Sequence, residues 1–256
     1  YEPEFTSLRE PNSVLSEIKV LAEAYGAVPG GIADVWLLVP PDQVRKRQKA
    51  YPFLKVHPIR FAPAELDINA WKLLMGMSDR DTVYFSEFNR ILRKHRGKLS
   101  LTVIGAELEA SLLTDAQKKL AQLRLLFAST FIDASAEIGR VAEPGRVILI
   151  DLRDEYATRA EMESLLLVLM SIFMNQRART GSNALVVIDE AHKLAQNKGV
   201  VLSTLIRMIR ERRHYGLNLV LASQSPLHPT IHELCDGICI CTCLLYTSPS
   251  PRDSLA

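Results

Sequence analysis

Short runs of apolar residues recur along the chain, each bounded by polar or turn-forming residues. Four of these runs are rich in Val, Ile and Leu, which is typical of strands buried on both faces of a parallel sheet. They are Val35 to Val39, Val147 to Ile150, Ala184 to Ile188 and Leu217 to Ala222. Two weaker runs, Val56 to Phe61 and Ile238 to Cys241, predict further short strands.

Between these runs the apolar residues recur at spacings of three and four, the period of an amphipathic helix. Helices are predicted at Val14 to Ala24, Asp115 to Phe127, Glu155 to Gln176 and Val200 to His214. In the second half of the chain strands and helices alternate, which predicts βαβ units. The expected fold class is α/β, with a mostly parallel sheet that carries helices on both faces.

Residues 63–143 interrupt this alternation, because their apolar residues follow helical spacing. We therefore expect a helical insertion at 63–143. Residues 1–62 and 144–242 then form the N-terminal and C-terminal parts of one core.

Composition narrows the class of protein. The chain has 256 residues, of which 48% are hydrophobic, so it is long enough to bury a full core. Lys and Arg number 31 against 29 Asp and Glu, a balance that excludes a histone-like polycation and an acidic tail. The longest apolar run, Leu165 to Met174, is shorter than the roughly 18 residues of a membrane span. With only four cysteines and no secretory signal at the start, a cytoplasmic protein without a membrane segment is expected.

The last fourteen residues differ in character from the rest. Cys243 to Asp253 resembles, residue for residue, the translation of the transposase adapter that is used to prepare sequencing libraries. We expect residues 243–256 to be a non-native tail that takes no part in the fold. The chain also begins without Met, within what looks like a loop, so we expect it to be a fragment.

Polar side chains follow the predicted strands at their carboxyl ends, where parallel sheets collect functional groups. Asp189 and Glu190 follow the strand that ends at Ile188. Adjacent residues at a strand exit point to opposite sides, so one carboxylate can address a metal while the other reaches a nucleophile. This pattern is typical of a Walker B strand, in which the first acid lies behind the Mg²⁺ of ATP and the second faces the attacking water. The alternative is a pair of acids that complement the dipole of a following helix.

A second polar exit strengthens the ATPase interpretation. The strand that begins at Leu217 ends in Ser223 and Gln224, and the helix before it ends in Arg213 and His214. An amide at this exit can sense a γ-phosphate. The alternatives are that Gln224 caps the next turn and that Arg213 is an ordinary exposed charge.

Three segments together resemble the HerA/FtsK superfamily of hexameric ATPases, and most closely its HerA-like branch. They are Val186 to His192, Arg213 to Leu217 and Leu219 to Gln224. In that branch an Arg three residues before a Gly precedes an apolar strand that ends in Ala-Thr-Gln or Ala-Ser-Gln. The resemblance is specific from about Gly145 to Thr242, loose over residues 1–61, and does not include the insertion.

The resemblance implies a RecA-like fold of the P-loop NTPase type, with ATP and Mg²⁺ as cofactors. It implies that Asp189 holds the Mg²⁺ shell through water, Glu190 is the catalytic base and Gln224 is the sensor. Arg213 becomes a candidate finger for the γ-phosphate of a neighbouring subunit. Family members form hexameric rings that move double-stranded DNA, often with a nuclease partner.

Two alternatives to a DNA translocase remain. One is a conjugation or type IV secretion ATPase of the same superfamily, which moves protein or single-stranded DNA. The other is an inactive ATPase-like subunit that acts as a scaffold for a nuclease.

The chain departs from the family in one respect. No Gly-x-x-x-x-Gly-Lys-Ser/Thr loop occurs, and the only Gly-Lys pair, Gly97-Lys98, lacks the first Gly. Without such a loop few groups can cradle the β- and γ-phosphates. We expect the loop to lie upstream of Tyr1, so the fragment itself should bind ATP poorly.

Other groups of residues give weaker indications of function. The basic stretch Arg45 to Lys49 is a weak candidate for DNA contact, whereas a solvated helix end is favoured for Arg93 to Arg96. Cys235, Cys239 and Cys241 are expected in the core rather than on a metal. Asp151 follows the predicted strand that ends at Ile150, and it is either a site residue or a helix cap. His192 is similar to the last residue of the Asp-Glu-Ala-His box of superfamily-2 helicases, but their Ser-Ala-Thr signature and their phosphate loop are not found.

Overall fold

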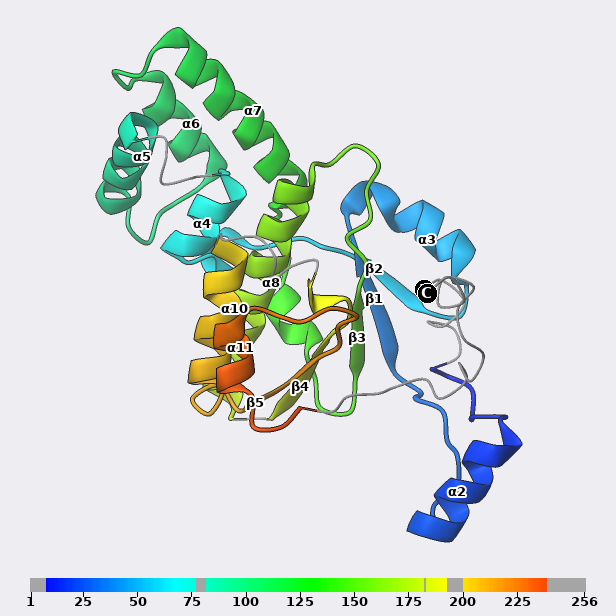
Figure 1. Cartoon of the computed structure of the whole chain (residues 1–256). Coiled ribbons are helices and arrows are strands. Elements are labelled where there is room, and N and C mark those ends of the chain that lie inside the picture. The colour runs from blue at the N-terminus through cyan, green and yellow to red at the C-terminus, as the bar shows by residue number, and fades with distance from the viewer. Residues whose placement is uncertain (1–7, 77–81, 182, 193–199, 239–256) are drawn as a thin grey trace, which may run out of the picture. The chain divides into compact units, whose positions relative to one another are not determined.

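The structure, a computed structural model of the chain, describes residues 8–76, 82–181, 183–192 and 200–238. The chain divides into two compact units. The first runs to Ala184 and includes His214–Gly216, and the second comprises Leu185–Arg213 and the chain from Leu217 onward. Figure 1 traces the course of the chain through both.

A three-stranded parallel sheet forms the centre of the first unit, with the order β2-β1-β3. Its strands are β1 (Val35–Val39), β2 (Lys55–Pro58) and β3 (Val147–Ile150). In the middle strand Leu37 pairs with Val56 on one side and with Leu149 on the other. The predicted parallel pairing is confirmed here, since β1 pairs in parallel with both neighbours. The bounds of β1 and β3 are also those that the apolar runs indicate.

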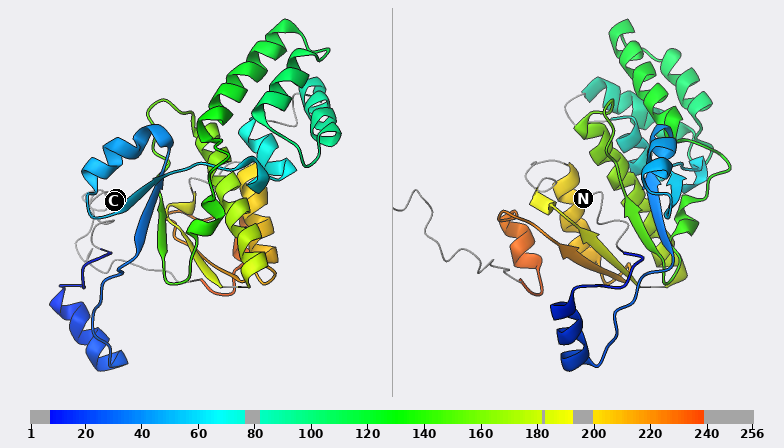
Figure 2. Two further views of the ribbon diagram at one scale, coloured as in Figure 1. Left: turned by 180° about the vertical axis from the view of Figure 1, so that it is seen from behind. Right: turned by 90° about the vertical axis from the view of Figure 1, so that its right-hand side faces the viewer.

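Both faces of this sheet are covered, which is why its central strand is apolar throughout. On one face Val35, Leu37 and Val39 pack with Tyr51 and Leu54, which follow helix α3 (Val44–Ala50). On the other face Leu38 packs in a larger core with residues of helix α8 (Arg159–Thr180). Figure 2 shows the strands of this unit between α3 and α8.

Helix α8 begins four residues later than the apolar spacing predicts, at Arg159 instead of Glu155. A capping box explains the difference, because Thr158 Oγ1 accepts the Glu161 N–H at 3.3 Å. In return a Glu161 carboxylate oxygen accepts the Thr158 N–H at 2.7 Å. The acid at 155 lies outside the helix and pairs instead with Lys46, at 2.8 Å.

The region predicted as a helical insertion consists of helices in the described residues. They are α4 (Ile68–Leu74), α5 (Thr82–Lys94), α6 (Leu101–Glu109) and α7 (Asp115–Phe131), with 3₁₀ turns η2 (Pro63–Glu65) and η3 (Ile138–Val141) at the two ends. Side chains cap three of these helices: Asp67, Ser100 and Thr114 each accept a backbone N–H of the first turn. The helices share the core of the first unit through Trp71 and Phe88, which are fully buried.

Helix α2 (Leu15–Tyr25) lies outside this core, because it buries none of its side chains. The turn η1 (Pro41–Gln43) leads directly from β1 into α3.

The second unit contains the strand β4 (Ala184–Ile188) from Leu185 onward, the strand β5 (Leu217–Leu221) and the helices α10 (Val200–Glu211) and α11 (Pro229–Leu234). The Ala184 N–H donates to Gly216 O, and the Ala222 N–H donates to Ile188 O, each at 2.9 Å. Residue numbers rise together along this pairing, so the two strands run parallel. Leu219 and Leu221 pack against a cluster from both helices that contains Leu202, Ile209 and Ile231.

The expectation that β4 is buried on both faces is wrong for the described residues. Leu185 and Val187 are 65% and 61% exposed, and burial alternates along the strand. The cluster with α10 and α11 engages one face of the two-stranded sheet, and alternate residues point to the opposite face. The predicted last strand, Ile238 to Cys241, falls outside the described residues from 239 onward.

The architecture is therefore α/β, with small parallel sheets and associated helices.

Candidate functional site

The exit of β4 is a sharp turn whose apex is Glu190. Its φ of +51° makes it the only non-glycine residue with a left-handed backbone among the residues that the structure describes. Such a conformation costs on the order of 1–3 kcal/mol and often occurs at functional sites. On either side of the apex, Ile188 O accepts the Ala222 N–H and the Ala191 N–H donates to Ala222 O, both at 2.9 Å. One residue of the β5 exit thus holds both arms of the turn.

The two predicted acids occupy different environments at this turn. Asp189 is exposed, and its Oδ1 accepts the N–H of Glu190 at 2.8 Å. The Glu190 side chain is only 13% exposed. The pair thus presents one carboxylate to solvent and holds the other among protein atoms.

The exit of β5 forms a second turn, which the hydroxyl of Ser223 organises. Its Oγ donates to Ser225 O at 2.5 Å and accepts the Ser225 N–H at 3.3 Å. The side chain of Gln224, between these two residues, is exposed. The hydrogen bonds of Ala222 therefore bring Gln224 to the same sheet edge as Glu190, as expected for the carboxyl ends of paired parallel strands.

His192 contacts both exits. Its Nε2 lies 3.6 Å from Glu190 Oε2, and its Nδ1 lies 3.4 Å from Ser223 Oγ. Sequence reasoning did not assign a role to Ser223 or to this histidine. The signal that could have found them is the position of each beside a predicted site residue at the exit of a strand.

Arg213 lies at the opposite end of β5 from this edge. It precedes the strand, whereas Gln224 follows it, and its side chain is exposed. A strand of five residues is about 17 Å long at about 3.3 Å per residue. The structure therefore does not bring Arg213 to Glu190 or Gln224 of the same chain.

In the first unit, Asp151 follows β3 and is buried between two arginines. Its Oδ2 lies 2.9 Å from Arg47 Nε, and Arg153 donates to both carboxylate oxygens at 2.8 and 2.7 Å. Burial raises the pKa of Asp151, but hydrogen bonds from Arg153 and the charges of Arg153 and Arg47 outweigh it, so the pKa lies below its usual value. Asp151 does not cap a helix, because α8 begins at Arg159.

This ion pair corrects one expectation about DNA contact. Arg47, in the middle of the basic stretch Arg45 to Lys49, is buried against Asp151 and cannot reach a phosphate outside. Lys46 of the same stretch pairs with Glu155.

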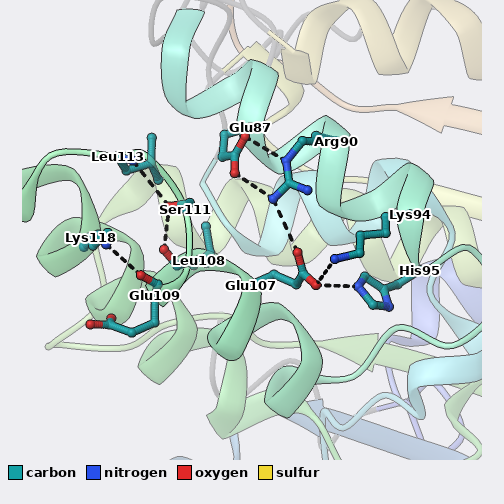
Figure 3. Close-up of polar contacts among 10 residues, drawn as sticks. All are labelled: Glu87, Arg90, Lys94, His95, Glu107, Leu108, Glu109, Ser111, Leu113 and Lys118. Carbon is teal, nitrogen blue, oxygen red and sulfur yellow. Dashed lines mark hydrogen bonds and ion pairs between the residues drawn. The ribbon is translucent and has the colours of Figure 1, made fainter.

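The basic end of α5 is partly neutralised by a single carboxylate, that of Glu107 in α6 (Figure 3). Its oxygens lie 2.6 Å from Lys94 Nζ, 2.9 Å from His95 Nε2 and 3.3 Å from Arg90 NH2. The hydrogen bonds from Lys94 and then His95 lower the pKa of Glu107 from its ordinary 4.5 to about 2. Lys94 and His95 of this run therefore serve the contact with Glu107 of α6.

Metal ligands are scarce in the part of the chain that the structure describes. There, no group of three or more His, Cys, Asp or Glu side chains could hold a metal ion. Cys235 is exposed, so the expectation that it lies in the core is wrong, while Cys239 and Cys241 lie outside the described residues. A single carboxylate such as that of Asp189 is still suited to Mg²⁺, which commonly takes one or two carboxylates together with phosphate oxygens and water.

Comparison with known proteins adds no assignment: no model of a protein family matches the chain, and no curated protein sequence does. Within the described residues, no helix is both long enough and apolar enough to pass through a membrane.

Proposed function

We propose that the intact protein is an ATP-hydrolysing DNA translocase of the HerA-like type, with its catalytic edge at the exits of β4 and β5. The observation that carries the proposal is the left-handed Glu190 at the β4 exit, which Ala222 of the β5 exit holds from both sides. Asp189 and Gln224 are exposed on the same edge. Two acids and an amide are thereby available to one ligand.

In this proposal Glu190 is the general base that removes a proton from the attacking water. Its side chain is 13% exposed, so solvent has limited access to the carboxylate. A base in such a position holds a water more firmly than a freely exposed acid does. The turn supports this role, because its two backbone hydrogen bonds fix the stretch of backbone from which the Glu190 side chain projects.

The residues at this edge suit Mg²⁺ and one phosphate of ATP, but not the whole triphosphate. The exposed carboxylate of Asp189 is a suitable oxygen donor for the Mg²⁺ shell, and the exposed amide of Gln224 can report on a phosphate. When bound, Mg²⁺ would neutralise charge on the phosphates. The sequence holds no Gly-x-x-x-x-Gly-Lys-Ser/Thr loop, so the proposal assigns the grip on the triphosphate to a segment outside these 256 residues.

The finer parts of the proposal are a RecA-like core, a hexameric ring that encircles double-stranded DNA, a nuclease partner and action in the cytoplasm. Parallel pairing within each sheet and the alternation of strands and helices support the core. Arg213 lies at the far end of β5 from Glu190 of its own chain, and the proposal assigns its guanidinium to the nucleotide of a neighbouring subunit in the ring.

The test is ATP hydrolysis by the full gene product, with Glu190→Gln as the decisive variant. We expect turnover to fall by about 100-fold or more, the scale of a lost general base, while ATP binding is retained. Glu233→Gln is the matched control, because Glu233 is an exposed acid of the same unit. If Glu190→Gln hydrolyses ATP like the wild type, Glu190 is not the base.

Duplex DNA distinguishes the translocase from its alternatives. A translocase should hydrolyse ATP faster with duplex DNA, and the stimulation should decrease as salt is raised, because phosphate contacts release counterions. Hydrolysis that duplex DNA leaves unchanged at low salt would favour a secretion ATPase. A full gene product that neither binds nor hydrolyses ATP would favour the scaffold.

A further inference from the structure

The side chain of His192 joins the two strand exits through opposite nitrogens of one ring. Nε2 faces Glu190 Oε2 at 3.6 Å and Nδ1 faces Ser223 Oγ at 3.4 Å. The first distance is too long for a hydrogen bond and is a packing contact, while the second is a long hydrogen bond. The imidazole therefore touches a side chain at each of the two strand exits.

Counting the hydrogens on Ser223 assigns a proton to the ring. A hydroxyl has one hydrogen to donate and two lone pairs. The Ser223 hydrogen goes to Ser225 O at 2.5 Å, and one lone pair accepts the Ser225 N–H at 3.3 Å. The remaining lone pair can only accept, so Nδ1 of His192 must carry the hydrogen of the contact with Ser223. This leaves Nε2 as the nitrogen that faces Glu190.

We propose that His192 is a positioning residue, which couples the turn around Gln224 to the carboxylate of Glu190. The inference rests on the proposed function and describes how its site is regulated. Any movement of the 223–225 turn displaces Ser223, and the imidazole transmits the displacement to Glu190 through two side-chain contacts. The state of the phosphate that Gln224 senses thereby reaches the base.

The backbone makes this role separable from folding. Ala191 is fully buried, and its N–H donates to Ala222 O at 2.9 Å. These contacts hold the two exits together whether or not residue 192 carries an imidazole. Removal of the ring should therefore leave the turn in place and remove only the contact of residue 192 with the Glu190 side chain.

The decisive measurement is steady-state ATP hydrolysis by the full gene product carrying His192→Ala. We expect kcat to fall by about 10- to 100-fold, because the base loses its contact with the imidazole, while KM for ATP stays within about twofold. His192→Gln and His192→Asn each keep a polar group near the position of only one of the two ring nitrogens, so both variants should remain impaired. His232→Ala, which removes an exposed histidine of the same unit, is the control and should hydrolyse ATP like the wild type.

A double-mutant cycle tests the coupling itself. If His192 acts through Ser223, the combination of His192→Ala with Ser223→Ala should lower kcat no further than His192→Ala does alone. Multiplying effects, or an unchanged kcat in His192→Ala, would overturn the proposal.

Nitrogen NMR of the 256-residue chain without nucleotide reads the ring directly. Nδ1 should carry the proton in the wild type, and the Ser223→Ala variant should lose this preference. A ring whose proton resides on Nε2, unaffected by Ser223→Ala, would also overturn the inference. Failure of the wild type to hydrolyse ATP would instead overturn the proposed function, so the two failures are distinguishable.

Discussion

Arg47 and Asp151 form an ion pair in the interior of the first unit, with Arg47 Nε 2.9 Å from Asp151 Oδ2 and side chains only 8% and 2% exposed. Arg47 belongs to α3, which follows β1, and Asp151 follows β3. The pair therefore connects a helix to the exit of a strand more than 100 residues away in the sequence.

Removing one partner of this pair should destabilise the chain strongly. Arg47→Ala leaves Asp151 buried with Arg153 as its remaining cation, and we expect the free energy of unfolding to fall by about 3 kcal/mol. Urea denaturation followed by circular dichroism measures the loss. Arg45→Met, at an exposed position of the same helix, is the control.

The double change Arg47→Met with Asp151→Asn removes both charges and should cost less than Arg47→Ala, because no buried charge loses its partner. If the double variant is the less stable of the two, the charge argument is wrong and packing dominates.

Glu107 should make the stability of the chain sensitive to acid. Its pKa of about 2 in the folded chain lies below its ordinary 4.5, because Lys94 and His95 bind the charged form. The stabilisation is fully present above about pH 4.5 and is lost as pH falls from there toward 2. The stability difference between wild type and Glu107→Gln should therefore shrink across this window, as measured by urea denaturation at a series of pH values. A difference that stays constant from pH 6 to pH 2, or an equal effect of Glu10→Gln at an exposed site, would contradict the assignment.

Glu65 joins the two ends of the helical region. One of its carboxylate oxygens accepts the N–H of Gly139 at 2.8 Å and the other accepts the N–H of Ala62 at 3.0 Å. Glu65→Gln replaces one acceptor by an NH₂ group that faces an N–H, so we expect a loss of about 2 kcal/mol in the free energy of unfolding. Glu137→Gln disrupts an exposed ion pair with Arg140 and should cost less than about 1 kcal/mol in the same assay. Equal losses in the two variants would show that the hydrogen bonds of Glu65 stabilise the fold no more than an exposed ion pair does.

Arg213 should act on a neighbouring subunit if the proposed ring exists. Arg213→Ala and Glu190→Gln should each be inactive alone, because one lacks the finger and the other the base. When the two are mixed, about a quarter of the interfaces combine an intact base with an intact finger, so ATP hydrolysis should partly return. Arg210→Ala, which removes an exposed arginine from the end of α10 just before Arg213, should keep full activity. A mixture as inactive as its components would exclude action in trans.

The local pattern of apolar and polar residues determined the bounds of several strands and the residues at their exits. The apolar runs predict β1, β3 and β4 with the bounds that the structure has. They do not predict the burial of each strand, since β1 is buried whereas alternate residues of β4 are exposed. The acids and the amide at the strand exits could also be read from sequence, since their positions follow from where the strands end. The apolar spacing puts the start of α8 four residues too early, although the sequence also holds the better signal, the capping box of Thr158 and Glu161.

Tertiary structure alone decided which polar groups meet. The sequence shows Arg47 as one cation in a basic stretch, and only the packing of α3 beside the exit of β3 makes it the buried partner of Asp151. In the same way, the contact of His192 with Ser223 exists because β4 and β5 pair, although 31 residues separate them. Hydrophobic periodicity reports the environment of each element. It carries no information on the partner of a charge or a hydroxyl, because that partner comes from a distant segment that folding brings within about 3 Å.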